Sequence, residues 1–123
     1  LYAGQVSSAD VPHYLSAFDV CTIPFPRTEH FAFYTSPLKL FEYMASGRAI
    51  VASDLPSWSD VLQDSENALL VTPENAQELA TAIGRLMQDA ELRKRLSSRA
   101  RSDVFAKYTW GSRARTILAS ISA

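Results

Sequence analysis

Three short apolar runs separated by helix-like stretches constrain the fold of this chain more than any other feature. They are residues 19–25 (DVCTIPF), 48–54 (RAIVASD) and 68–71 (ALLV). Each run is apolar along most of its length instead of alternating, which is typical of parallel strands covered on both faces. Residues 1–4 (LYAG) have the same character and predict a further strand. Because parallel strands need crossover connections, the order predicts an α/β protein: a Rossmann-like parallel sheet of about four strands with covering helices.

The helices can be placed by their capping residues and by apolar spacing. Residues 8–18 repeat apolar side chains at helical intervals, and three further stripes follow the last strand. Glu78 lies three residues after Asn75, which is the spacing of a capping box. The sequence therefore predicts a helical carboxyl-terminal tail, and the predicted N-cap residues are Ser8, Asn75, Asp89 and Thr109.

The segment 25–36 (FPRTEHFAFYTS) has no strong helix or strand pattern, so we expect a mobile loop. It leads into a predicted helix that has Ser36 as N-cap, Pro37 as first helical residue and Gly47 as the stop after Ser46. Since that helix follows a strand, its first turn should lie at the carboxyl edge of the sheet, where such folds bind ligands.

The start of that helix is a predicted anion site. Its unpaired N–H groups and the positive end of its dipole favour a phosphate or diphosphate, and Lys39 adds a charge in the first turn. Glu42 lies one turn further along, in an otherwise apolar stretch. Its carboxylate either forms a surface pair with Lys39, worth about 0.2–0.5 kcal/mol, or accepts hydrogen bonds from the vicinal diol of a ribose. The spacing alone leaves both readings open.

The composition limits the classes of binding partner and the cellular compartment that we expect for this protein. The 123 residues make up one domain, and 12 basic against 13 acidic residues give a net charge of -1, which indicates neither nucleic-acid binding nor a polybasic membrane anchor. The single cysteine, Cys21, fits a reducing compartment. We expect a cytoplasmic protein, with peripheral contact at the cytoplasmic membrane face left open. No group of residues has metal-ligand spacing, so no bound metal is expected.

Three stretches carry a resemblance to a known family: SPLKLFEYMASGRAIVASDLP, NALLVTPENAQELATAIGRLMQD and AR…YTW. They resemble the carboxyl-terminal, nucleotide-binding domain of glycosyltransferase family 4, whose members are retaining enzymes of the two-domain GT-B architecture. The resemblance implies that residues 1–123 are a single partial domain whose acceptor-binding partner lies upstream. It also implies that residues 109–123 form a terminal helix that crosses back to the missing domain.

The same resemblance implies an activity. The full-length protein would be a hexosyltransferase-type enzyme that moves a sugar from a nucleotide diphosphate-sugar to an acceptor that the sequence does not identify. No cofactor is expected, and the main basic catalytic residues would lie upstream of this fragment, which should be inactive alone. Glu42 matches the family glutamate that binds the donor ribose. The residues that would serve the donor diphosphate are Thr35, Ser36, Pro37 and Leu38, through backbone amides, with Lys39 as a possible catalytic cation.

One departure from the family pattern concerns the donor sugar. The family often carries a second glutamate eight positions before the first, and Tyr34 stands there in this chain. Possible donor-sugar or loop contacts are therefore Tyr34, His30 and Arg27, with Glu29 as a further substitute. Two alternatives stay open: a GT-B nucleotide-sugar epimerase, and a non-catalytic nucleotide-sugar-binding module. Apolar side chains of the terminal helix also predict self-association.

Two further side chains have competing interpretations. Cys21 lies in an apolar strand and is interpreted as a small core residue instead of a nucleophile. Trp58 either stacks on a nucleotide base or covers the core, and the sequence does not decide between these roles.

Overall fold

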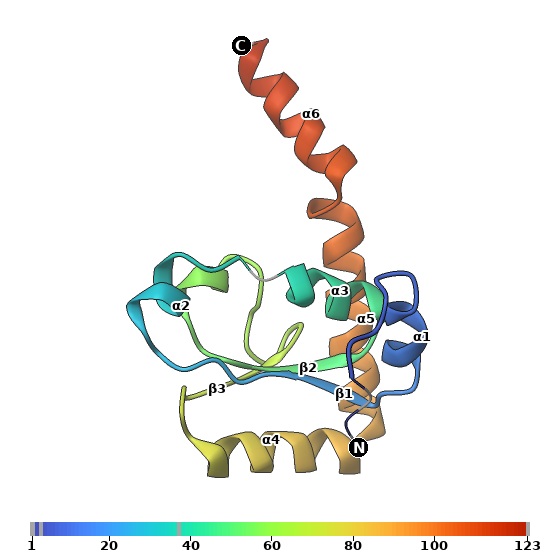
Figure 1. The fold of residues 1–123 in the computed structure, drawn as a ribbon, viewed down its shortest axis with the longest axis vertical. Helices are drawn as coiled ribbons and strands as arrows, with labels where there is room; N and C mark the ends of the chain where they lie inside the picture. Colours follow the sequence, from blue (N-terminus) through green and yellow to red (C-terminus); the bar gives the residue numbers. More distant parts are fainter. Residues whose placement is uncertain (1, 3, 37, 123) are drawn as a thin grey trace.

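A parallel three-stranded sheet lies at the centre of the computed structural model, which describes residues 2, 4–36 and 38–122 (Figure 1). The strands are β1 (Val20–Ile23), β2 (Ala49–Ser53) and β3 (Leu69–Val71), in the order β1-β2-β3. Val20 lies opposite Ala49, and Val51 lies opposite Leu69. Every residue of the central strand is buried, as expected for a parallel strand covered on both faces. The predicted α/β class with a parallel sheet is confirmed.

The further strand predicted at residues 1–4 is not formed by the residues described there. Tyr2 and Gly4 belong to no strand, and Tyr2 is exposed. Gly4 has a φ of 77°, a left-handed conformation that turns the chain instead of extending it. Leu1 and Ala3 lie outside the described residues. The prediction of about four strands is thus corrected to three in the described part of the chain.

Helices cover both faces of the sheet and divide the core in two (Figure 1). Ile50 and Ala52 of β2 pack with α3 (Leu38–Ser46), whereas Ala49 and Val51 pack with α4 (Ala76–Gln88). Helix α5 (Ala90–Lys107) reaches both cores, because Leu92 and Leu96 join the second cluster while Ala100 and Val104 join the first. This long helix therefore fixes the two layers against each other.

The caps of the last three helices are as predicted. The side chain of Asn75 accepts from the Glu78 N–H, that of Asp89 from the Leu92 N–H, and that of Thr109 from the Ser112 N–H. The capping box is only half formed, because the Glu78 carboxylate accepts from the Thr72 N–H instead of reaching back to Asn75. Local sequence signals thus determine where these helices begin.

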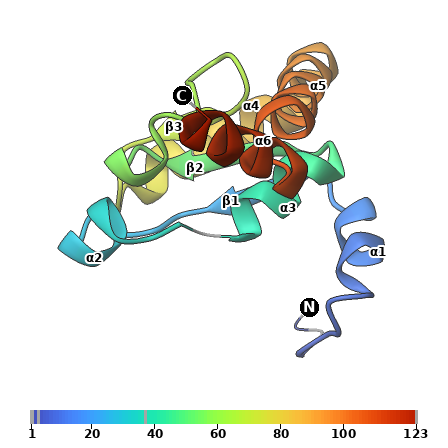
Figure 2. The same cartoon turned by 90° about the horizontal axis from the view of Figure 1, so that it is seen from above.

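The first helix begins later than predicted. Helix α1 (Val11–Ser16) is preceded by a turn in which Asp10 N–H donates to Ser7 O at 3.0 Å and Ser7 Oγ donates to the Asp10 carboxylate at 2.7 Å. That turn takes up the residues before Val11, so Ser8 is not the N-cap. Figure 2 shows α1 beside the end of the sheet, where it contacts α3.

The segment 25–36 is not loop throughout, as its pattern predicted, while its mobility without ligand stays a prediction. It contains helix α2 (Glu29–Phe33), capped by Thr28, whose side chain accepts from the Phe31 N–H. The Phe31 ring lies 4.6 Å from that of Phe25, and Ser57 Oγ, from the short 3-10 helix Pro56–Trp58, donates to Phe31 O at 2.8 Å. Contacts with distant residues supply the order that the local sequence pattern lacks.

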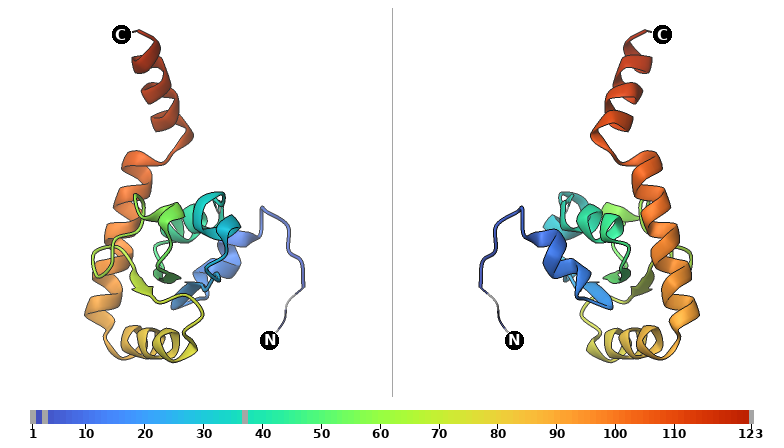
Figure 3. Two further views of the ribbon diagram at one scale, coloured as in Figure 1. Left: turned by 90° about the vertical axis from the view of Figure 1, so that its left-hand side faces the viewer. Right: turned by 90° about the vertical axis from the view of Figure 1, so that its right-hand side faces the viewer.

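Helix α6 (Trp110–Ile121) projects away from the sheet beyond the end of α5 (Figures 1 and 3). None of its residues is buried, and Trp110 is 83% exposed. Its other exposed large apolar side chains are Ile117, Leu118 and Ile121. Within the described residues, none of the helices is both long enough and apolar enough to cross a membrane.

Candidate functional site

Helix α3 carries the residue that the sequence singled out. Leu40 and Met44 lie on its inner face, in the core, and Glu42 lies on an exposed face. Gly47 ends the helix as predicted, with a φ of 69° and its N–H donating to Met44 O at 3.2 Å. Pro37, predicted as the first helical residue, lies outside the described residues, and the predicted cap by Ser36 stays a prediction.

The start of α3 lies at the carboxyl edge of the sheet. The helix connects β1 to the parallel strand β2, so it must run back along the sheet and begin where β1 ends (Figure 1). Ser36, Leu38 and Lys39 are exposed there. The Thr35 hydroxyl is already engaged, because it donates to His30 O at 3.1 Å and ties the end of α2 to the connection.

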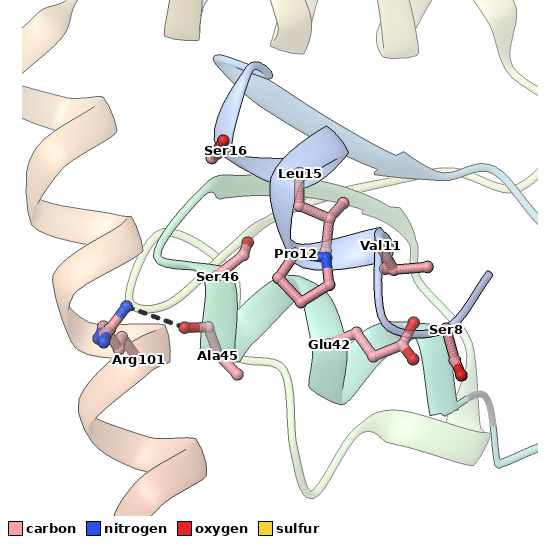
Figure 4. Close-up of a pocket in the computed structure, with 9 residues that line it drawn as sticks. All are labelled: Ser8, Val11, Pro12, Leu15, Ser16, Glu42, Ala45, Ser46 and Arg101. Carbon is pink, nitrogen blue, oxygen red and sulfur yellow. Dashed lines mark hydrogen bonds between the residues drawn. The ribbon is translucent and has the colours of Figure 1, made fainter. Parts of the chain in front are cut away.

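Glu42 faces a groove of about 400 Å³ between α1 and α3 (Figure 4). In Figure 4 the Glu42 carboxylate and the Ser8 side chain lie toward one end, and Arg101 of α5 lies toward the other. The residues that line the groove are Ser8, Val11, Pro12, Leu15, Ser16, Glu42, Ala45, Ser46 and Arg101. An apolar wall from α1 thus stands opposite a free carboxylate from α3.

Glu42 does not form the surface ion pair with Lys39 that the sequence left open as one of its two roles. Among the residues that the structure describes, the ion pairs join Asp103 to Arg99 and to Lys107, and neither Lys39 nor Glu42 takes part. The carboxylate is therefore available to accept hydrogen bonds from a ligand in the groove.

The candidate loop contacts are exposed but stand apart from that groove. Arg27, Glu29 and His30 are exposed, with the His30 ring edge-on to Phe31 at 5.3 Å. Tyr34 is 72% exposed. Within the described part of the chain, none of these side chains lines the groove that Glu42 faces. They belong instead to the connection that leads into α3.

Arg101 was missed by sequence reasoning. Its Nη1 donates to Ala45 O at 3.0 Å, across 56 residues of sequence, and its side chain closes one end of the groove. Only the AR…YTW stretch, used above as part of the resemblance, included this residue. Spacing along one helix cannot reveal a partner that another helix supplies.

The structure decides the roles of Cys21 and Trp58. Burial raises the pKa of the Cys21 thiol to about 11, although the charge of Arg48 acts in the opposite direction, so the thiol is protonated at neutral pH and is a core residue. Trp58 is buried, and its Nε1 donates to Ser53 O at 2.9 Å. The indole therefore covers the core and is not free to stack on a base.

A second hollow of about 200 Å³ lies where β2 and β3 end. Ser53, Val71 and Glu74 contribute to it, and Glu74 places an acidic side chain beside the first turn of α4. Within the described residues, no group of three or more His, Cys, Asp or Glu side chains is placed to hold a metal ion.

Comparison with known proteins now places the chain in a family. The family model described as "Glycosyl transferases group 1" matches residues 1–89. This chain belongs to that family. The phosphatidyl-myo-inositol mannosyltransferase of Mycolicibacterium smegmatis is 33% identical over 109 residues, which are 89% of this chain and 27% of that protein. The chain thus spans about a quarter of the length of this relative.

Solved structures agree with the fold. The carboxyl-terminal domain of a group 1 glycosyltransferase (LpcC) from Francisella tularensis superposes with a TM-score of 0.75 at 25% identity, covering 89% of this chain and 53% of that one. HepE of Anabaena, solved in complex with UDP-glucose, gives a TM-score of 0.76 at 22% identity, covering 92% and 30%. The predicted Rossmann-like half of a GT-B glycosyltransferase is confirmed.

Proposed function

We propose that this chain is the donor-binding domain of a retaining glycosyltransferase, which moves a sugar from a nucleotide diphosphate-sugar to an acceptor. The observation that carries the proposal is the exposed Glu42 carboxylate, free of ion pairs in the described structure and one turn inside α3, facing a groove. Membership of the group 1 family supports it, as does the existence of a protein of this fold solved with UDP-glucose.

The diphosphate would bind at the first turn of α3. Backbone N–H groups of Thr35, Ser36 and Leu38 and the charge of Lys39 are the donors available there. Pro37 contributes no donor, since proline has no N–H group, and this corrects its inclusion among the predicted amide donors. As the bond to the sugar breaks, negative charge grows on the leaving diphosphate, and a fixed cluster of donors stabilises it without reorganisation.

The ribose would bind at Glu42. Glu42 follows Leu38 by four positions, which is about 6 Å along the helix axis, so a ribose attached to a diphosphate at the helix start can reach the carboxylate. Its two hydroxyl groups would donate to the two carboxylate oxygens. The apolar side chains of Val11, Pro12 and Leu15 on α1 would then flank the nucleoside.

The proposal is tested by measuring nucleotide affinity in the full-length protein. UDP, GDP and ADP are titrated calorimetrically against wild type and Glu42→Gln, which keeps the volume and removes the charge. A hydrogen bond to a charged group contributes about 1.5–3 kcal/mol, so affinity should fall roughly tenfold or more. Glu66→Gln, an exposed residue outside the groove, is the matched control and should change nothing. Unchanged affinity in folded Glu42→Gln would refute the ribose assignment.

A second variant separates the two halves of the ligand. Lys39→Gln should weaken binding of UDP but leave uridine unaffected, because Lys39 is placed to serve the diphosphate and not the ribose. Glu42→Gln should weaken both ligands. An assay with a nucleotide-sugar then distinguishes transfer to an acceptor from isomerised free sugar, the product of an epimerase, and from binding without turnover.

A further inference from the structure

The carboxyl end of α3 is capped by three donors, one of which comes from another helix. Ser46 Oγ donates to Tyr43 O at 2.7 Å, and Gly47 N–H donates to Met44 O at 3.2 Å. The next carbonyl along the chain, that of Ala45, accepts from Arg101 Nη1 at 3.0 Å (Figure 4). These carbonyls would otherwise lack partners at a helix end. Arg101 thus supplies the cap that α3 cannot make for itself.

The Arg101 side chain is itself held in place. Its Cζ lies 5.4 Å from the centre of the Phe105 ring, one turn further along α5, in a cation–π arrangement. Its Cδ and Nη1 lie 3.5 and 3.6 Å from where a Cβ on Gly47 would stand, so the side chain runs beside the backbone of that glycine. The cation also lies beside the negative end of the α3 dipole. Arg101, although exposed, therefore links α5 to the last turn of α3 through contacts on both helices.

That link lies one turn away from Glu42. Ala45 follows Glu42 by three residues, so the two lie on the same side of the helix, and both line the groove together with Arg101. Leu40 and Met44 hold the opposite side of α3 in the core. The rotation of α3 about its axis is then fixed from the core by packing and from the groove by the Arg101 bond.

We propose that Arg101 is a positioning residue for Glu42. It acts through α3, by keeping the last turn fixed so that the carboxylate points into the groove. The inference rests on the proposed role of Glu42 in binding the donor ribose. It adds a residue that reaches the site from 56 positions away in the sequence.

The test is a double-mutant cycle in the full-length protein, with UDP, GDP and ADP as probes. Arg101→Met keeps an unbranched apolar stem over Phe105 and removes the donors. In the wild-type background it should weaken nucleotide binding roughly three- to tenfold, a coupling typical of groups that share one structural unit. In the Glu42→Gln background it should add nothing further. Arg101→Lys, which keeps one donor and the charge, should restore part of the loss.

The matched control comes from the same helix. Arg95 Nη1 donates to a backbone carbonyl, Ser65 O, at 3.1 Å, but the acceptor is in the loop before β3 and not in α3. Arg95→Met should therefore leave nucleotide affinity unchanged. Thermal unfolding of each variant verifies that the fold is intact. If Arg101→Met fails to fold, the nucleotide affinity of Arg101→Lys, measured in the wild-type and Glu42→Gln backgrounds, takes its place in the cycle.

The outcomes are distinct. Weaker binding in Glu42→Gln with unchanged binding in Arg101→Met would overturn the positioning role and leave the proposed function intact. Equal losses from Arg101→Met in both backgrounds would also overturn it, because Arg101 would then act independently of Glu42. Unchanged binding in Glu42→Gln would remove the ribose assignment and the positioning role together.

Discussion

The side-chain amide of Asn67 donates a hydrogen bond to the carboxylate of Asp103, with Nδ2 3.1 Å from Oδ2 across 36 residues of sequence. Both residues are buried. The same amide also donates to Val61 O at 2.9 Å and accepts from Gln63 N–H at 2.8 Å. This one side chain therefore joins the loop before β3 to helix α5.

Asn67→Ala should destabilise the protein by about 2 kcal/mol, because it leaves the part-buried Val61 carbonyl and Gln63 N–H unpaired and removes one donor to the Asp103 carboxylate. Urea unfolding measures the change. Ser98→Ala, an exposed position on α5, is the control and should stay within about 0.5 kcal/mol of wild type. A loss for Asn67→Ala as small as that of the control would mean that water replaces the amide without cost.

Acid should weaken the fold through Asp103. Burial raises the pKa of this carboxyl, but hydrogen bonds from Asn67 and Arg99 and the charges of Arg99 and Lys107 outweigh it, so the pKa lies below the ordinary value. A depressed folded-state pKa contributes stability that is present above the unfolded value of about 3.9 and is lost as pH falls through the folded value. Unfolding free energies at pH 7, 5, 4 and 3 should therefore fall less steeply in Asp103→Asn than in wild type. Parallel pH profiles would contradict this assignment.

Trp58→Phe should lower stability without changing nucleotide affinity. The indole is buried and donates to Ser53 O, so the smaller ring leaves a gap and an unpaired carbonyl. We expect a loss of about 2 kcal/mol. Unfolding and UDP titration on the same sample measure both quantities. A large drop in affinity with intact stability would contradict this assignment and indicate that Trp58 contacts the nucleotide.

The exposed apolar face of α6 should drive self-association of the 123-residue chain. Trp110, Ile117, Leu118 and Ile121 expose at least half of their surface, and such patches seek partners. Sedimentation should show dimers or larger species, and Leu118→Lys should shift them to monomers. Ser120→Lys, also exposed on α6, tests whether added charge alone has this effect. A wild-type monomer at high concentration would exclude the idea.

The connection between α2 and α3 should become ordered when nucleotide binds. Phe31 is anchored by Phe25 and Ser57, so amides in α2 should exchange slowly even without ligand. Amides of residues 35 and 36 border the proposed diphosphate site and should slow on addition of UDP. Hydrogen exchange with and without UDP tests this, and an identical rate in both states would count against a diphosphate at α3.

Features encoded within a few residues were the ones that could be predicted from the sequence. The caps at Asp89 and Thr109 and the stop at Gly47 depend on side chains or backbone conformations next to the helix ends, so local signals identified them. Glu42 was identified because a carboxylate in an apolar helix is unusual. That Glu42 takes part in no ion pair among the described residues could be learned only from the structure.

Features that depend on distant contacts were missed. Helix α2 is held by Phe25 and Ser57, which no local pattern within 25–36 could indicate. In α4 the buried positions are Ala82 and Leu86, whereas Met87 is exposed although it is apolar. The buried face of α4 is narrower than the number of its apolar residues suggests, because only one side of the helix packs against the sheet. The groove itself is assembled from three separate helices.

The span of α5 across both cores restricts where related chains can change in length. One residue inserted between Leu96 and Ala100 would turn everything after it by about 100°. Ala100 would leave the core, Arg101 would point away from α3, and Asp103 would lose Asn67, all through a single event. The loop at 63–66 is exposed, and Ser65 already adopts a φ of 60° there, so added residues can extend into solvent. Natural variation in chain length should therefore accumulate in that loop, whereas α5 keeps a constant number of residues.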